Sequence, residues 1–129
     1  MNLDIKEIVK IITALGGFIA GLFLGLHVFY QLLIMFALMD IVVGILTGGK
    51  KGKLSSTISY LGMRKKAIMF ILVGLSEILG RTLNAPIGVA VASFYLAHEG
   101  LSILENSIEA GLPIPDILRK AIAQFAEKE

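Results

Sequence analysis

Five ionisable residues lie inside long apolar stretches of this sequence, and they are the residues whose chemistry most needs an explanation. A carboxylate or a cation in an apolar, membrane-like environment costs about 2.5–3.5 kcal/mol, so such groups commonly bind or relay ions and protons. Their presence therefore marks a candidate functional site. These membrane-embedded polar residues are Asp40, Glu77, Arg81, His98 and Glu99.

Two of these positions have a structural alternative. Asp40 fits either a functional carboxylate or a structural one that is protonated or paired with a lysine near the membrane interface. Glu77 and Arg81 are four residues apart, a spacing that favours a neutralising pair on one helix. Arg81 also lies near the end of its apolar run, where its side chain can reach the interface.

The sequence contains no motif typical of catalysis, phosphate binding or metal binding. Cysteine is absent, and no phosphate-binding loop, His-Glu-x-x-His motif or nucleophile elbow is present. We expect His27 and His98 to lie toward opposite sides of the membrane, as packing or interfacial residues. The sequence therefore predicts neither an enzyme nor a cofactor or metal site.

The composition indicates that lipid is the solvent for most of the chain. Of 129 residues, 56% are hydrophobic and 17% are charged, and the mean hydropathy is +0.83. Soluble domains are about 45–50% apolar and about 25% charged. A soluble domain of this size would need a larger polar surface, so we expect an integral membrane protein.

The apolar runs predict an all-α protein with four short transmembrane helices, arranged as two hairpins. Residues 11–48 form one run of 38 residues, which as a single helix would be about 57 Å long, against a hydrocarbon core of roughly 30 Å. We therefore expect a tight turn at 27–31. The predicted spans lie near 9–26, 31–48, 67–83 and 86–104, within a transmembrane domain at 1–110. A cytoplasmic amphipathic C-terminal tail follows at 111–129, with its helix at 116–128.

Glycines recur every fourth residue in the first two predicted spans. Small residues at this spacing let a second helix approach closely, which drives helix association in lipid. We expect these glycines to form helix-packing faces, with a partner in the same chain or in another copy. They are Gly17, Gly21 and Gly25 in the first span, and Gly44 and Gly48, in register with Asp40, in the second.

Half of the basic residues lie in the connection at 49–66. Short loops rich in Lys and Arg stay in the cytoplasm, so this loop and both termini are predicted to be cytoplasmic. The loop lacks the aromatic residues and the reading helix of a nucleic-acid site, so we expect it to contact lipid headgroups instead. Its basic residues are Lys50, Lys51, Lys53, Arg64, Lys65 and Lys66.

Several short motifs follow one another over about 40–120. They are Asp40-Ile-Val-Val-Gly44, Ser55-Ser56, Gly62-Met63-Arg64-Lys65-Lys66, Glu99-Gly-Leu-Ser-Ile-Leu-Glu-Asn106 and Gly111-Leu-Pro-Ile-Pro115. In this order, the motifs resemble those of the toxin secretion/phage lysis holins, also called bacteriophage holin family 4. The resemblance implies a homo-oligomer in the bacterial cytoplasmic membrane that opens lesions, with an endolysin or a secreted toxin as functional partner. It brings no catalytic residues.

Two other functions remain open from the sequence. One is a small ion or proton channel or carrier that uses Asp40, Glu77 and Glu99, although no internal repeat supports a carrier. The other is a non-conducting membrane scaffold whose C-terminal helix recruits a cytoplasmic partner.

Overall fold

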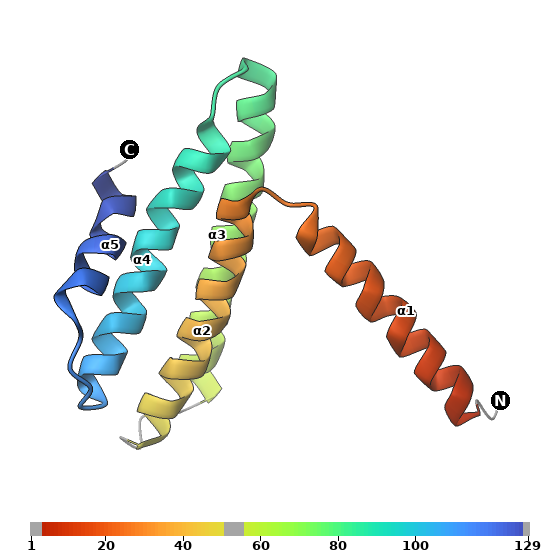
Figure 1. The fold of residues 1–129 in the computed structure, drawn as a ribbon, viewed down its shortest axis with the longest axis horizontal. Helices are drawn as coiled ribbons and strands as arrows, with labels where there is room; N and C mark the ends of the chain where they lie inside the picture. Colours follow the sequence, from red (N-terminus) through yellow and green to blue (C-terminus); the bar gives the residue numbers. More distant parts are fainter. Residues whose placement is uncertain (1–3, 51–55, 128–129) are drawn as a thin grey trace.

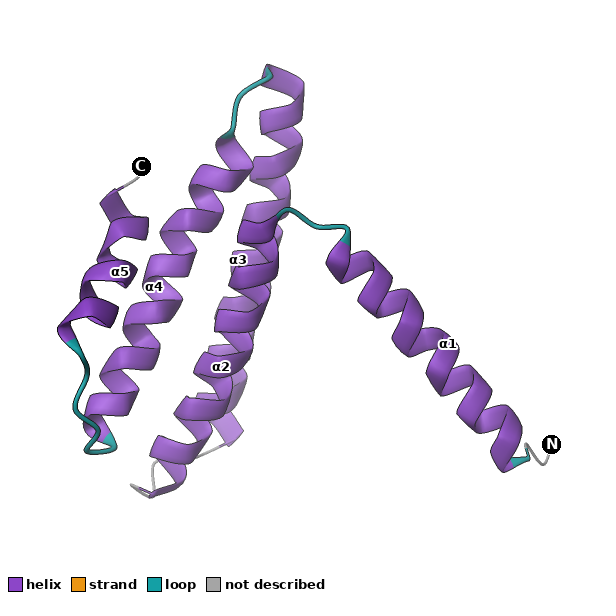
Figure 2. Cartoon of the chain, viewed as in Figure 1, coloured by secondary structure: helices purple, strands orange, loops and turns teal. Residues whose placement is uncertain are grey.

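The described part of the chain is helical, with no strand. The computed structural model describes residues 4–50 and 56–127, and these form five helices (Figure 1, Figure 2). The elements are α1 (Ile5–Leu24), α2 (Val28–Lys50), α3 (Ser56–Leu83), α4 (Ile87–Glu109) and α5 (Asp116–Glu127). The all-α prediction is confirmed for these residues.

The first turn lies at 25–27, earlier in the chain than the predicted 27–31. His27 is the reason, because it caps the start of α2 rather than interrupting an apolar run. Its carbonyl accepts the backbone N–H groups of Tyr30 and Gln31, at 2.9 and 3.2 Å, and its Nδ1 accepts the N–H of Phe29 at 3.2 Å. The ring and the carbonyl of His27 thus satisfy backbone donors at the helix start that would otherwise lack partners.

Helices α3 and α4 are each followed closely by a residue that takes a left-handed backbone conformation. Asn84 takes a left-handed φ of 50° between the two helices, a conformation that Asn tolerates better than most residues. Gly111 takes a φ of 91° after α4, and the N–H of Leu112 donates to the carbonyl of Ser107 at 3.1 Å. This is the usual glycine-terminated helix end.

Helix α4 is the centre of the bundle and packs against α2, α3 and α5. It runs parallel to α2 and antiparallel to α3 (Figure 1). The small residues Gly88, Ala92 and Gly100, which lie four and eight residues apart, let its neighbours approach closely. The buried cluster between these helices consists of Leu33 and Ala37 from α2, Met69 and Val73 from α3, and Ala92 and Leu96 from α4.

Helix α1 stands apart from this bundle (Figure 1). None of its residues is buried. The Gln31 amide helps to set its direction, because Nε2 donates to the carbonyls of Phe23, Leu24 and Leu26 at 3.2, 3.3 and 3.1 Å. These bonds tie the end of α1 to the first turn of α2, so the two helices do not form the closely packed hairpin that the sequence predicted.

Helix α5 packs on α4 of its own chain. Ile122 is its buried contact and lies against Gly100, where an added Cβ would be 2.7 Å from Ile122 Cδ1. Ile117 and Leu118 on the same helix are exposed, at 80% and 44%. The predicted helix is present, and its role as an amphipathic surface element stays a prediction.

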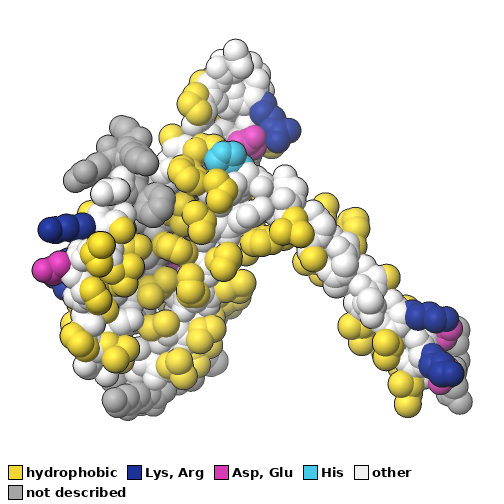
Figure 3. Space-filling view, viewed as in Figure 1, with side chains coloured by type: hydrophobic (Ala, Val, Ile, Leu, Met, Phe, Trp, Pro, Cys, Tyr) yellow, Lys and Arg dark blue, Asp and Glu magenta, His cyan; other side chains and the backbone are white. Residues whose placement is uncertain are grey.

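Three of the helices in the described residues are long and apolar enough to cross a membrane, namely α1, α2 and α4. The predicted third span at 67–83 forms the second half of α3, but α3 also carries charged residues and does not reach the same apolarity, so the count of four spans is not confirmed. Apolar side chains cover much of the face of the bundle and of α1 that Figure 3 shows. The exposed large apolar residues of the described chain include Phe18, Leu46 and Ile71. A surface this apolar suits contact with lipid or with other helices.

Candidate functional site

One polar cluster joins the three bundle helices near the middle of α2 and α4. Lys66 Nζ donates to Asp40 Oδ2 at 2.8 Å and also to Glu99 Oε2. The side chains of Lys66 and Asp40 are each 14% exposed, and that of Glu99 is 6% exposed. We call Asp40, Lys66 and Glu99 the inner cluster. Each helix contributes one member, so the cluster links α2, α3 and α4 through charge.

The position of Lys66 corrects its grouping with the headgroup-binding residues of the loop. Its side chain turns into the bundle because two carboxylates face it there, and pairing lowers the cost of burying all three charges. Arg64 and Lys65 are exposed, and their contact with headgroups stays a prediction. The side chains of Lys50, Lys51 and Lys53 lie outside the described residues.

The inner cluster holds two carboxylates for one ammonium group, so its ionised form carries one surplus negative charge. Asp40 Oδ1 is buried and has no hydrogen-bond partner. A cavity of about 280 Å³ adjoins the cluster and is also lined by Tyr95 and Ser102. A proton or a small cation in this cavity would offset the surplus charge, which is costly to bury, and water there could donate a hydrogen bond to Asp40 Oδ1.

His98 lines the same cavity but is itself exposed. The described residues contain no group of three or more His, Cys, Asp or Glu side chains placed to hold a metal ion.

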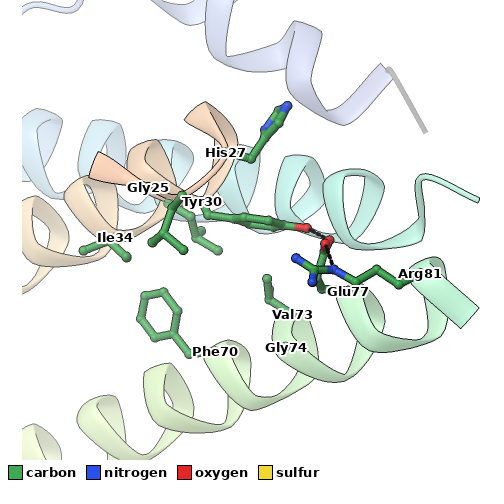
Figure 4. Close-up of a pocket in the computed structure, with 11 residues that line it drawn as sticks. Gly25, His27, Tyr30, Ile34, Phe70, Val73, Gly74, Glu77 and Arg81 are labelled. Carbon is green, nitrogen blue, oxygen red and sulfur yellow. Dashed lines mark hydrogen bonds and ion pairs between the residues drawn. The ribbon is translucent and has the colours of Figure 1, made fainter. Parts of the chain in front are cut away.

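A second polar cluster lies toward the other end of the bundle. Arg81 Nε donates to Glu77 Oε1 at 2.9 Å, which is the pair expected from their spacing. Tyr30, which the sequence analysis did not single out, donates its hydroxyl to Glu77 Oε2 (Figure 4). We call Tyr30, Glu77 and Arg81 the outer cluster. It joins α2 to α3.

Gly88 on α4 closes the outer cluster from its far side. A Cβ at Gly88 would lie 2.8 Å from Glu77 Cα and would also meet the Tyr30 hydroxyl. Only a glycine leaves room for α3 and α4 to approach this closely. The four-residue spacing from Gly88 to Ala92 is the sequence signal for this contact, although Gly88 was not among the predicted packing glycines.

The two clusters are separate sites. Lys66 and Glu77 are eleven residues apart on α3, or about 16 Å along the helix. The structure therefore brings Asp40 and Glu99 together and leaves Glu77 elsewhere. A channel that uses all three carboxylates would need a path between the two clusters. Contacts among these residues within one chain do not form such a path.

Four of the five predicted packing glycines face no neighbouring helix among the described residues. A Cβ added at Gly17, Gly21 or Gly44 would meet nothing within 4 Å, and one at Gly25 would meet only the backbone of its own helix. Gly48 lies in the last turns of α2. Packing of these faces against another copy stays a prediction.

The all-helical fold and its three long apolar helices indicate a helical membrane protein. The sequence pattern of the bacteriophage holin family matches residues 17–127, so this chain belongs to that family. Its members are pore-forming membrane proteins and not enzymes.

Several relatives match most of the chain. An uncharacterized protein of Listeria innocua is 34% identical over 126 residues, which cover 95% of this chain and 90% of that protein. An uncharacterized protein of Clostridium perfringens is 31% identical over 121 residues and covers 92% of both chains. A probable holin of Bacillus phage phi105 is 29% identical over 92 residues, with 70% of this chain and 68% of the phage protein covered. No solved structure matches this chain.

Proposed function

We propose that this protein is a phage-type holin. It oligomerises in the bacterial cytoplasmic membrane and forms lesions through which an endolysin, or a secreted toxin, leaves the cell. The family match over residues 17–127 and the relative named as a probable holin support this function.

The observation that carries the proposal is the unpartnered state of α1. This helix is apolar beyond Lys10, and none of its residues is buried in the chain. Gly17 and Gly21 leave an open strip along it, against which another helix could pack closely. The remaining bundle needs no contact with α1 to form its core. A second copy of the chain is therefore the partner that we propose for α1.

We further propose that α3 is the fourth span. Its 28 residues give a length of about 42 Å, enough to cross a hydrocarbon core of roughly 30 Å. Charges inside a membrane are tolerated where they pair. Lys66 pairs with Asp40 and Glu99, and Glu77 pairs with Arg81. Four spans would place both termini in the cytoplasm, in agreement with the excess of basic residues at 50–66.

The test is inducible expression in a bacterium that also makes a cytoplasmic endolysin. We expect abrupt lysis after a delay, with release of the endolysin. Gly21→Leu adds bulk on the small-residue strip and should delay or abolish lysis. Ile19→Phe is the matched control, because it adds bulk about 200° around α1 and should leave the lysis time near that of the parent protein.

Three outcomes would contradict the proposal. Altered ion flux with the endolysin retained would indicate a small channel, and no effect on either would indicate a scaffold. Equal effects of Gly21→Leu and Ile19→Phe would show that the small-residue strip is not the packing face. Membrane levels of each variant, measured by immunoblot, separate a loss of function from a loss of protein.

A further inference from the structure

A cavity of about 330 Å³ lies between α2 and α3, on the side where α1 leaves the bundle (Figure 4). The outer cluster forms its polar end. Its opposite wall is apolar and includes Ile34, Phe70 and Val73. A cavity with one polar end and one long apolar wall matches an amphiphilic ligand.

The polar end can donate hydrogen bonds to an anion. Both oxygens of Glu77 already accept a hydrogen bond, one from Tyr30 and one from Arg81 Nε. The Arg81 side chain is 79% exposed, and its terminal nitrogens make no hydrogen bond to a described residue. These nitrogens form the planar donor pair that binds phosphate oxygens well.

The apolar wall has the length of half a bilayer. Arg81 and Phe70 are eleven residues apart on α3, or about 16 Å, and half of the hydrocarbon core is roughly 15 Å thick. Gly74 lies along this wall, and nothing occupies the space within 4 Å of the Cβ that it lacks. A chain running from Arg81 toward Phe70 would therefore follow the path of a lipid tail in one leaflet.

The cavity is too small for a helix of another copy. A helix segment of about 16 Å, with a diameter of about 10 Å, fills roughly 1,250 Å³, several times the space present. An acyl chain is much thinner than a helix and needs no backbone hydrogen-bond partners. The dimensions thus favour a lipid tail over a protein segment.

We propose that this cavity binds one acyl chain of a glycerophospholipid, whose phosphate is held by the terminal nitrogens of Arg81. Bound lipid would fill the space beside the turn at 25–27 and so occupy the place where α1 departs. This inference rests on the membrane insertion of the proposed function, but it does not depend on the formation of lesions.

The absence of tryptophan makes the proposal testable with a single introduced fluorophore. Phe70→Trp places the probe in the cavity, and Ile71→Trp places a control at nearly the same depth on the exposed side of α3, where Ile71 is 67% exposed. Each variant is reconstituted in phosphatidylcholine vesicles that contain increasing fractions of phosphatidylglycerol. Either lipid in turn carries brominated acyl chains, which quench tryptophan on contact.

We expect brominated phosphatidylglycerol to occupy the Phe70→Trp site roughly threefold better than brominated phosphatidylcholine. One unpaired basic residue near a membrane surface would give a preference of roughly fivefold. The expected value is lower because Glu77 offsets part of the Arg81 charge. The Ile71→Trp control should show no preference. Adding Arg81→Gln should remove the preference at Phe70→Trp, and adding Gly74→Leu should remove the quenching there but not at Ile71→Trp.

Two results would overturn the proposal. If Phe70→Trp escapes quenching by either lipid, protein and not lipid fills the cavity. If the preference is absent, or survives Arg81→Gln, the phosphate is not held by Arg81. Neither result bears on lysis, which the expression experiment measures independently.

Discussion

The inner and outer clusters use the same kinds of side chain in opposite surroundings. In the inner cluster, one lysine pairs with two carboxylates, and no side chain is more than 14% exposed. In the outer cluster, Arg81 pairs with Glu77 alone, and their side chains are 79% and 33% exposed, respectively. A buried charge that loses its partner is far more costly than an exposed one. We therefore expect the inner cluster to hold the bundle together and the outer cluster to contribute mainly to contacts at the membrane boundary.

Because of this difference, we expect the inner cluster to stabilise the fold and the outer cluster to bind a ligand. The inner cluster connects three helices that are far apart in the sequence, so its loss would loosen all of them. The outer cluster is closed by Gly88 on one side and open to the cavity on the other. Its exposed guanidinium is free to meet a ligand.

The largest effect is expected from Lys66→Met, which leaves Asp40 and Glu99 buried without their cation. Removing one partner of a buried ion pair costs about 3–5 kcal/mol. The purified protein in detergent should therefore unfold at a clearly lower temperature or denaturant concentration. Lys65→Met is the matched control, because Lys65 is exposed and such surface substitutions change stability by about 0.5 kcal/mol or less.

A second set of variants distinguishes charge from packing at this site. Adding Asp40→Asn and Glu99→Gln to Lys66→Met removes every charge of the inner cluster and should recover much of the lost stability. If the triple variant is no more stable than Lys66→Met, the lysine acts through packing and the comparison between the clusters fails.

An intermediate effect is expected where α4 closes the outer cluster. Gly88→Ala places a Cβ against Glu77 Cα and the Tyr30 hydroxyl, so α3 and α4 must separate. Such overpacking costs about 1–3 kcal/mol. Gly74→Ala is the control on α3, because its new Cβ meets nothing within 4 Å and a helix gains stability from Ala in place of Gly. Thermal unfolding in detergent should therefore shift in opposite directions for the two variants.

The smallest effect is expected from Arg81→Gln. The arginine is mostly exposed and Glu77 keeps its hydrogen bond from Tyr30, so the unfolding transition should remain close to that of the parent protein. Unfolding of Arg81→Gln and Lys66→Met, measured side by side, checks the comparison directly. A destabilisation by Arg81→Gln as large as that by Lys66→Met would show that the outer cluster also holds the bundle.

Much of the helical pattern could be predicted because it depends on short-range chemistry. The end of α4 follows from Gly111, which takes the left-handed conformation expected of it. The pair between Glu77 and Arg81 follows from their four-residue spacing. The turn before α2 was predicted at 27–31 but lies at 25–27. His27 was interpreted as part of the turn, whereas it caps the helix.

The candidate site was predictable only in part. Asp40 and Glu99 stood out as carboxylates in apolar sequence, but nothing in their spacing indicated that one lysine would serve both. Lys66 belongs to a basic segment that matches the pattern of a headgroup-binding loop. Its neighbours Arg64 and Lys65 are indeed exposed. Which of three adjacent cations turns inward depends on the rotation of α3 against α2 and α4.

By itself, the sequence determined that this chain is helical and suited to lipid, and it determined the contacts between residues one helical turn apart. Only the tertiary structure decided which distant residues meet: Lys66 with Asp40 and Glu99, which lie 26 and 33 residues away, and Tyr30 with Glu77, 47 residues away. The reason is geometric. Spacing within a helix is set by 3.6 residues per turn, whereas contacts between helices depend on the rotation and axial register that packing around the small residues of α4 selects.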